Sequence, residues 1–298
     1  MRGLLSIAKA TALEILSEPL SLLVMLSALV LTVFAPAFHY HQFGDPTRMA
    51  RDAGLSALFT CGSVIAVFCT IRTFRREIES GTLEMTLAHS VSRTGCFLAK
   101  TLGATLAYLA FALVIFGTAM VMFDGAAVGG VLARQTGDVA RIWGPCLAGG
   151  VAVILLPLVL AAALNRFAQF RFVLSAVMLA VLLGAAGAVV VAFHAGAFAL
   201  RLVPVAVLIV LPTLVLLAAA AAFSVCLRAN AAAAAVGVVF ALLLPAVGNY
   251  YLADALSGNG TLPWRYVALA AAVTAPGVAA FLVLGIRFIN GRDILWTT

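Results

Sequence analysis

The sequence predicts an all-α, polytopic membrane protein with about eight transmembrane helices in a single transmembrane domain over residues 1–298. First, 64% of the residues are hydrophobic and the mean hydropathy is +1.17, whereas soluble domains have about 45–50% apolar residues. Second, apolar runs of about 20 residues recur, and each is long enough to cross the hydrocarbon core as a helix. Third, these runs do not alternate in polarity, as the strands of a membrane barrel do.

Residues 1–18 predict an amphipathic helix that lies on the cytoplasmic membrane surface. Its apolar positions recur at helical spacing, while Lys9 and Glu14 fall elsewhere on the helical wheel. Glu18-Pro19 is a natural break, because proline suits the first turn of a new helix. The alternative is that residues 1–18 simply begin the first span. The apolar run that follows is expected to stay as a signal anchor.

Eight spans are expected, with short connections and no soluble domain between them. They are 19–38, 54–71, 97–123, 144–164, 171–193, 202–227, 231–249 and 266–288. Pro204, Pro212 and Pro245 leave a second possibility open, namely six full spans plus a re-entrant hairpin. Broken helices of that kind are tolerated where protein covers the backbone.

The distribution of basic residues predicts that both termini are cytoplasmic. With the termini inside, twelve of the eighteen basic residues fall in cytoplasmic segments and six fall outside, as the positive-inside rule requires. The outer six are Arg48, Arg51, Arg134, Arg141, Arg201 and Arg265. The same rule accounts for the net charge of +7, so no nucleic-acid partner is inferred.

Metal and disulfide chemistry is only weakly indicated. The five cysteines form no CxxC pair, so neither a zinc site nor a disulfide framework is suggested. His39, His41 and Asp45 lie together after the first span and could bind a metal transiently. The favoured interpretation is that these side chains occupy the headgroup zone, and no resident metal is predicted.

The most informative segment is residues 72–100, which carry eight charges between two apolar runs. Five are basic and three are acidic: Arg72, Arg75, Arg76, Arg93, Lys100, Glu77, Glu79 and Glu84. A charged segment of this kind is costly to translocate, so residues 72–96 are expected in the cytoplasm. Within it, 83–88 can form a short helix with Glu84 in the first turn, where the helix dipole favours an acid.

Residues 79–100 resemble the cytoplasmic loop of type-2 ABC transporter permeases. That pattern reads Glu-x-x-Gly-Thr-Leu-Glu-x-x-Leu, then Pro-Val-Ser-Arg, then a lysine that opens the next span. This chain has Glu79-Ser-Gly81-Thr82-Leu83-Glu84-Met-Thr-Leu87, then Val91-Ser92-Arg93 and Lys100. It departs at Glu79, which lies two rather than three positions before Gly81, and at Ser90, where proline is usual and sets the local turn. The resemblance covers about residues 1–123 and fades afterwards, since many members of the family have six spans.

The resemblance implies a coupling helix that docks on a separate ABC ATP-binding subunit. By the match, the docking residues would be Glu79, Gly81, Thr82, Leu83, Glu84, Leu87 and Arg93. ATP and Mg²⁺ would bind to that subunit rather than to this chain. A second permease copy or paralogue would complete the complex in a bacterial inner membrane, where it would export an unidentified substrate. The bland alternative is an ordinary solvated loop with positive-inside anchors.

Two further functional classes are an ion-coupled carrier and a mechanical membrane subunit. The sequence contains no GxxxxGK[ST], HExxH or GxSxG motif, so ATPase activity is expected in a partner chain. Ion-coupled carriers normally place charged working groups inside the membrane, and such charges are almost absent from the expected spans. A membrane subunit that uses ATPase strokes mechanically, to assist envelope-protein maturation with a periplasmic factor, remains the alternative to export.

Overall fold

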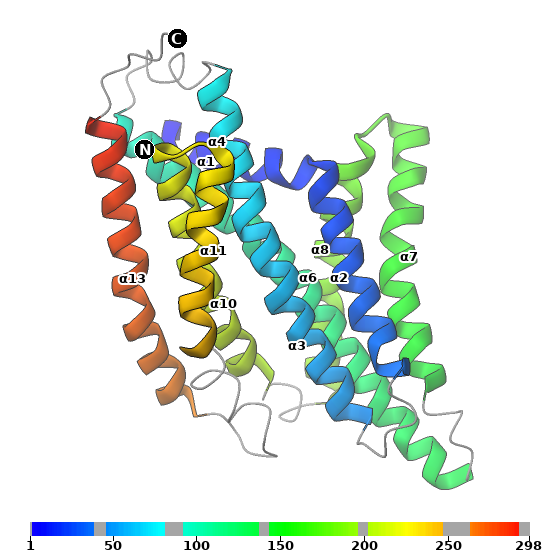
Figure 1. Ribbon diagram of the computed structural model, residues 1–298. Coiled ribbons are helices and arrows are strands. Elements are labelled where there is room, and N and C mark those ends of the chain that lie inside the picture. Colours follow the sequence, from blue (N-terminus) through cyan, green and yellow to red (C-terminus); the bar gives the residue numbers. More distant parts are fainter. Residues whose placement is uncertain are drawn as a thin grey trace.

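The protein is a bundle of helices that run up and down beside one another (Figure 1). The computed structural model describes residues 2–38, 46–80, 92–136, 143–195, 202–246 and 263–291, and it contains no β-strand within those ranges. The elements are α1 (Arg2–Ser17), α2 (Pro19–Phe38), α3 (Pro46–Val64), η1 (Ile65–Cys69), α4 (Thr70–Glu79), α6 (Arg93–Thr136), α7 (Trp143–Ala168), α8 (Phe172–Ala195), α10 (Leu202–Cys226), α11 (Ala229–Ala246) and α13 (Trp264–Gly291).

Six helical stretches of the described chain are long and apolar enough to cross a membrane. They are Met49–Glu79, Arg93–Val128, Leu147–Ala168, Phe172–His194, Leu202–Cys226 and Trp264–Gly291. The α1–α2 pair would add a seventh if the bent pair is one span, and α11 is a shorter apolar helix. The all-helical architecture is therefore confirmed within the described ranges, with six candidate membrane spans, and each of the eight expected spans overlaps a helix. Their number as full spans stays a prediction.

Helix α1 lies across one end of the bundle, because the chain bends by 63° at Glu18, between α1 and α2. The buried face of α1 carries Ala8, Thr11 and Ile15, which recur at helical spacing. A Cβ added at Gly103 of α6 would come within 2.8 Å of Thr11 Cβ, so the glycine permits the close crossing of α1 over α6. The bend fits the expected surface helix, whose place in a bilayer stays a prediction.

The described ends of the chain lie at the same end of the bundle. Helix α1 crosses the end at which α4 and α13 also finish (Figure 1). An even number of passes produces this arrangement, whichever side of the membrane that end faces. Helices α10 and α11 meet at this end too and run in opposite directions.

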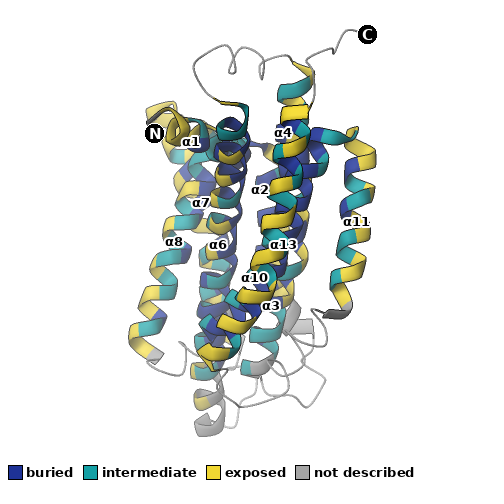
Figure 2. Cartoon of the chain, turned by 90° about the vertical axis from the view of Figure 1, so that its left-hand side faces the viewer, coloured by how far each residue is buried: buried dark blue, intermediate teal, exposed yellow. Residues whose placement is uncertain are grey.

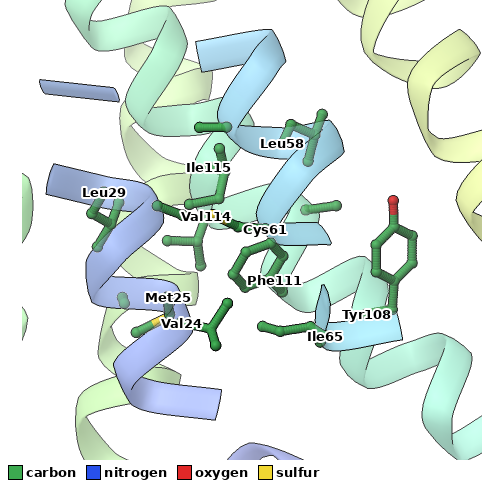
Figure 3. Close-up of a cluster of buried hydrophobic side chains, with 14 of the residues drawn as sticks. Val24, Met25, Leu29, Leu58, Cys61, Ile65, Tyr108, Phe111, Val114 and Ile115 are labelled. Atoms are coloured by element: carbon green, nitrogen blue, oxygen red, sulfur yellow. The ribbon is translucent and has the colours of Figure 1, made fainter. Parts of the chain in front are cut away.

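The central helices are buried and the outer helices are exposed along their outward faces (Figure 2). The largest apolar cluster joins α2, α3 and α6, with Leu29, Leu58 and Ile115 almost completely buried. Figure 3 shows these side chains among others of the cluster that come from the three helices. Because the interior of the bundle is apolar, close packing rather than polar contacts holds most of its length together.

Helix α10 continues through Pro212, a proline at which the sequence allows the helix to break. The Thr213 hydroxyl donates to the Val210 carbonyl oxygen at 2.7 Å and also contacts the Tyr108 hydroxyl of α6. Because proline has no N–H, the Leu208 carbonyl oxygen lacks its usual helical donor, and the packing of neighbouring helices lets a membrane helix continue through such a gap. The polar contact with Tyr108, which is also fully buried, fixes α10 against α6 at the same level.

The second expected span extends beyond its predicted end at residue 71. Its helix runs from Pro46 to Glu79, with the π-helical segment η1 between α3 and α4. It continues as α4 because its buried face, which includes Ile71 and Phe74, still packs on the bundle while its arginines lie on the more exposed side. The residues expected to be a cytoplasmic segment therefore begin as a continuation of the span.

Helix α6 is also longer than expected, at 44 residues. At 1.5 Å per residue it extends for about 66 Å, roughly twice the thickness of a hydrocarbon core. The expected outer connection over 124–143 is helical as far as Thr136. Asp124 lies 3.5 Å from His194 of α8, and this contact links α6 to α8 beyond the expected end of the span.

Helices α6 and α8 approach each other at a pair of glycines. A Cβ at Gly117 would overlap the Gly184 carbonyl oxygen, and a Cβ at Gly184 would lie 3.0 Å from Val114 Cα. Small residues at such crossings let two backbones come close enough for extensive van der Waals contact.

We predict that Gly117→Ala lowers the stability of the protein by about 1–3 kcal/mol, because the added methyl group forces α6 and α8 apart. The matched control is Gly237→Ala on α11, where an added Cβ meets nothing within 4 Å; it should be neutral or stabilising by up to about 1 kcal/mol. Apparent melting temperatures of the detergent-solubilised variants test this. Equal melting temperatures for the two variants would contradict the α6–α8 crossing.

The predicted orientation can be checked with reporter fusions in a bacterial host. Green fluorescent protein after Thr298 should fluoresce, because it folds in the cytoplasm, and alkaline phosphatase inserted after Asp45 should be active, because it folds outside. An active phosphatase at Thr298 would refute the cytoplasmic assignment of the C-terminus.

Candidate functional site

The expected docking segment falls between α4 and α6 in the sequence, and the described ends of these two helices lie at the end of the bundle where α1 crosses (Figure 1). Gly81, Thr82, Leu83, Glu84 and Leu87 are outside the residues that the structure describes. The remaining two docking residues are described: Glu79 is the last residue of α4 and Arg93 is the first of α6. The site is therefore built from the two helix ends that carry the segment.

The end of α4 is amphipathic. Glu79 accepts from Arg75 at 2.9 Å between Oε1 and Nη2, one helical turn away. The Glu79 side chain is 63% exposed and that of Arg75 is 12% exposed. Glu79 is thus free on one side for a partner, while Arg75 is held in the wall of the bundle.

The start of α6 is fixed by a cap and by a neighbouring helix. The Gly95 backbone N–H donates to Ser92 Oγ at 3.1 Å, which satisfies one of the unpaired donors of the first turn. Asn290 of α13 donates to Thr94 Oγ1 at 3.3 Å. Arg93 is therefore the first residue of a helix whose first turn is anchored to the C-terminal end of α13.

Two contacts join the α4 side of the segment to the α6 side. Lys100 forms an ion pair with Glu77, and its side chain is 3% exposed. One turn earlier on each helix, the rings of Phe74 and Phe97 pack with their centroids 5.7 Å apart. Phe97 belongs to an apolar cluster that also includes residues of α10 and α13. A displacement of the segment would thus reach four helices through a few contacts.

Two acidic residues, Glu14 of α1 and Glu18 at the bend between α1 and α2, link this part of the chain to α4. Glu18 Oε1 lies 3.0 Å from Arg72 Nε, and Glu14 Oε1 lies 3.7 Å from Arg76 Nη1. From the sequence alone, these arginines are interpreted as positive-inside anchors, and no acidic partner is predicted for them. The four-residue spacing of Glu14 and Glu18, matched by that of Arg72 and Arg76, is the signal that could have predicted two parallel ion pairs.

Cavities lie on both sides of α4, and Arg76 and Ser80 line both. The cavity toward α1 and α6 has a volume of about 460 Å³ and includes Glu14, Glu77 and Lys100 in its wall. The cavity toward α2 and α11 has a volume of about 680 Å³ and includes Arg72, Arg75 and Asn230. Helix α4 is therefore packed on its apolar side but borders open space on its polar side.

No group of three histidine, cysteine, aspartate or glutamate side chains that could hold a metal ion occurs within the described ranges. His39, His41 and Asp45 lie outside those ranges, so the weak metal hypothesis at that place is untested. Cys61, Cys69 and Cys96 are buried free thiols.

Comparison with known proteins adds no assignment: no family model, curated protein or solved structure matches the chain.

We predict that Glu77→Gln destabilises the protein by about 3 kcal/mol, because it removes the carboxylate that pairs with the buried Lys100 ammonium. Glu77→Gln combined with Lys100→Met should recover most of the loss, since a double change removes both charges. The control is Glu79→Gln, which breaks an ion pair with an exposed carboxylate and should cost less than about 1 kcal/mol. Thermal unfolding in detergent measures all three. If Glu77→Gln and Glu79→Gln behaved alike, the Glu77–Lys100 pair would not be a structural contact.

Proposed function

We propose that this chain is the transmembrane permease subunit of an ABC transporter, located in a bacterial inner membrane, and that it couples ATP hydrolysis by a separate subunit to substrate export. The single observation that carries this proposal is the ordered pattern from Glu79 through Gly81-Thr82-Leu83-Glu84 to Ser92-Arg93 and Lys100. A charged loop alone requires no such order, whereas a docking helix needs a capped start, an acidic first turn and an apolar face.

The geometry around that segment supports the proposal. A docking element can act on the membrane domain only if its two ends are firmly attached to helices that cross the bundle. The Glu77–Lys100 ion pair and the Phe74–Phe97 contact supply such attachments. Helix α1 adds a further attachment through Glu14 and Glu18.

In this mechanism ATP and Mg²⁺ bind to the partner ATPase, and closure of two such subunits pushes on the docking segments of two permease chains. The push passes through α4 and α6 into α10 and α13, whose side chains meet Phe97. Rigid helices that pivot against one another then alternate the bundle between two arrangements. The second permease copy or paralogue completes the complex.

The proposal predicts that Glu84→Arg weakens association with the ATPase by about tenfold or more, because it reverses a charge within the docking surface. The control is Arg166→Glu, which reverses an exposed charge at the end of α7 near the same end of the bundle. Co-purification of the tagged permease with its ATPase, followed by ATPase measurements on the complex in liposomes, tests both variants.

Retention of the ATPase and normal ATP turnover by Glu84→Arg would refute docking through residues 79–93. Failure of the wild-type chain to retain any P-loop ATPase would refute the proposed class altogether. If the complex forms but no substrate stimulates its ATPase, the export assignment is wrong and a mechanical subunit replaces it.

A further inference from the structure

The cavity between α4 and α11 combines features that the proposed ATPase docking does not use. Among the residues that the structure describes, three arginines line it, Arg72, Arg75 and Arg76, together with one carboxylate, that of Glu79. Glu14 and Glu18 lie behind Arg76 and Arg72 and are not part of the cavity wall.

The arginines keep donors available despite their ion pairs. Arg75 donates from Nη2 to Glu79, and its Nε is buried without a hydrogen-bond partner among the described residues, so the donors that face the open cavity belong mainly to the other two arginines. Arg72 uses Nε toward Glu18, and its side chain is 60% exposed. Arg76 is 67% exposed and lies at the edge of the cavity. A phosphate group has enough oxygens to accept from several guanidinium groups at once.

The start of α11 adds backbone and side-chain donors to the same cavity. Ala229 and Asn230, the first two residues of this 18-residue helix, line it. The first turn of a helix carries unpaired N–H groups and a partial positive charge, which favour an anion. The Asn230 amide is exposed and can contribute a further donor.

The other wall of the cavity is apolar. It is formed by Leu20 of α2, Phe68 and Ile71 of the helix that ends in α4, and Ala233 of α11. These side chains belong to helices with long apolar stretches, whereas the arginines follow directly at the polar end. A site that is basic at one end and apolar along the other matches a molecule with an anionic head and a hydrocarbon tail.

We propose that the α4–α11 cavity binds the phosphate group of an anionic phospholipid, with Arg72, Arg75 and Arg76 at the headgroup and the apolar wall against an acyl chain. A free phosphate shares the headgroup chemistry but leaves the apolar wall uncovered. Basic pockets between membrane helices at the aqueous boundary suit acidic headgroups for these reasons. The proposal does not depend on the ATPase partner.

Native mass spectrometry tests this inference. The purified full-length chain is measured in detergent micelles that contain both phosphatidylglycerol and phosphatidylcholine. The wild-type protein should retain phosphatidylglycerol preferentially, and both Arg75→Gln and Arg76→Gln should retain about fivefold less. Arg166→Gln removes an exposed arginine at the same end of the bundle and should have no effect. Because the Arg76 side chain is mostly exposed, we expect Arg76→Gln to fold even if Arg75→Gln does not. The melting temperature of each variant shows whether it is folded.

Three outcomes would overturn the proposal. Equal retention of the two lipids would mean that the headgroup charge is not recognised. An equal loss in Arg166→Gln would mean that the attraction is spread over the whole basic surface. Displacement of phosphatidylglycerol by excess inorganic phosphate would mean that the cavity takes a soluble anion rather than a lipid.

Discussion

A charged side chain can be buried in an apolar bundle only beside an opposite charge, and the arrangement of α1, α4 and α6 follows from this constraint. Lys100 lies in the second turn of α6 and is almost inaccessible to solvent, so α6 must have an acid beside it, and Glu77 of α4 meets that need. Once α4 is held there, Arg72 and Arg76 face the acids of α1. The direction in which α1 crosses the bundle is thus tied to a single buried ammonium group.

Helix α4 connects the two proposals, because each concerns a different side of it. The side toward α6 carries the contacts that would pass motion from a docked ATPase into the bundle. The side toward α11 carries the arginines proposed to hold a lipid phosphate. A lipid bound there would neutralise part of the charge on α4 without breaking the Glu77–Lys100 pair. Both functions would then use the same short helix but depend on different residues of it.

The helical membrane fold was predictable from the sequence because the length and polarity of a run suffice to identify a helix that can cross a bilayer. Its boundaries were less predictable, because packing rather than polarity decides them. Residues after Ile71 read as a polar loop, yet Phe74 still faces the bundle and prolongs the helix. Pro212 read as a break, but Thr213 supplies a hydrogen bond within the helix. For the site, the resemblance of residues 79–93 to a docking segment can be recognised in the sequence because the order of these residues is local, and the docking itself stays a prediction. The matched four-residue spacings of Glu14 with Glu18 and of Arg72 with Arg76 indicate that two ion pairs can form side by side, but only the fold brings these segments, more than fifty residues apart, into contact.

The π-helical segment Ile65–Cys69 has a consequence for how α3 and α4 are oriented about their common axis. A π-helical turn accommodates an additional residue within an otherwise α-helical path, and one residue corresponds to about 100° of rotation. The apolar face that α3 presents to the core and the face on which α4 carries its charges are therefore offset in angle, although the helix stays continuous. The chain adjusts the direction of its charged face by local winding instead of by a loop. Helix α4 therefore stays rigidly joined to α3, while its charged face points in a different direction about the axis than it would in an uninterrupted α-helix.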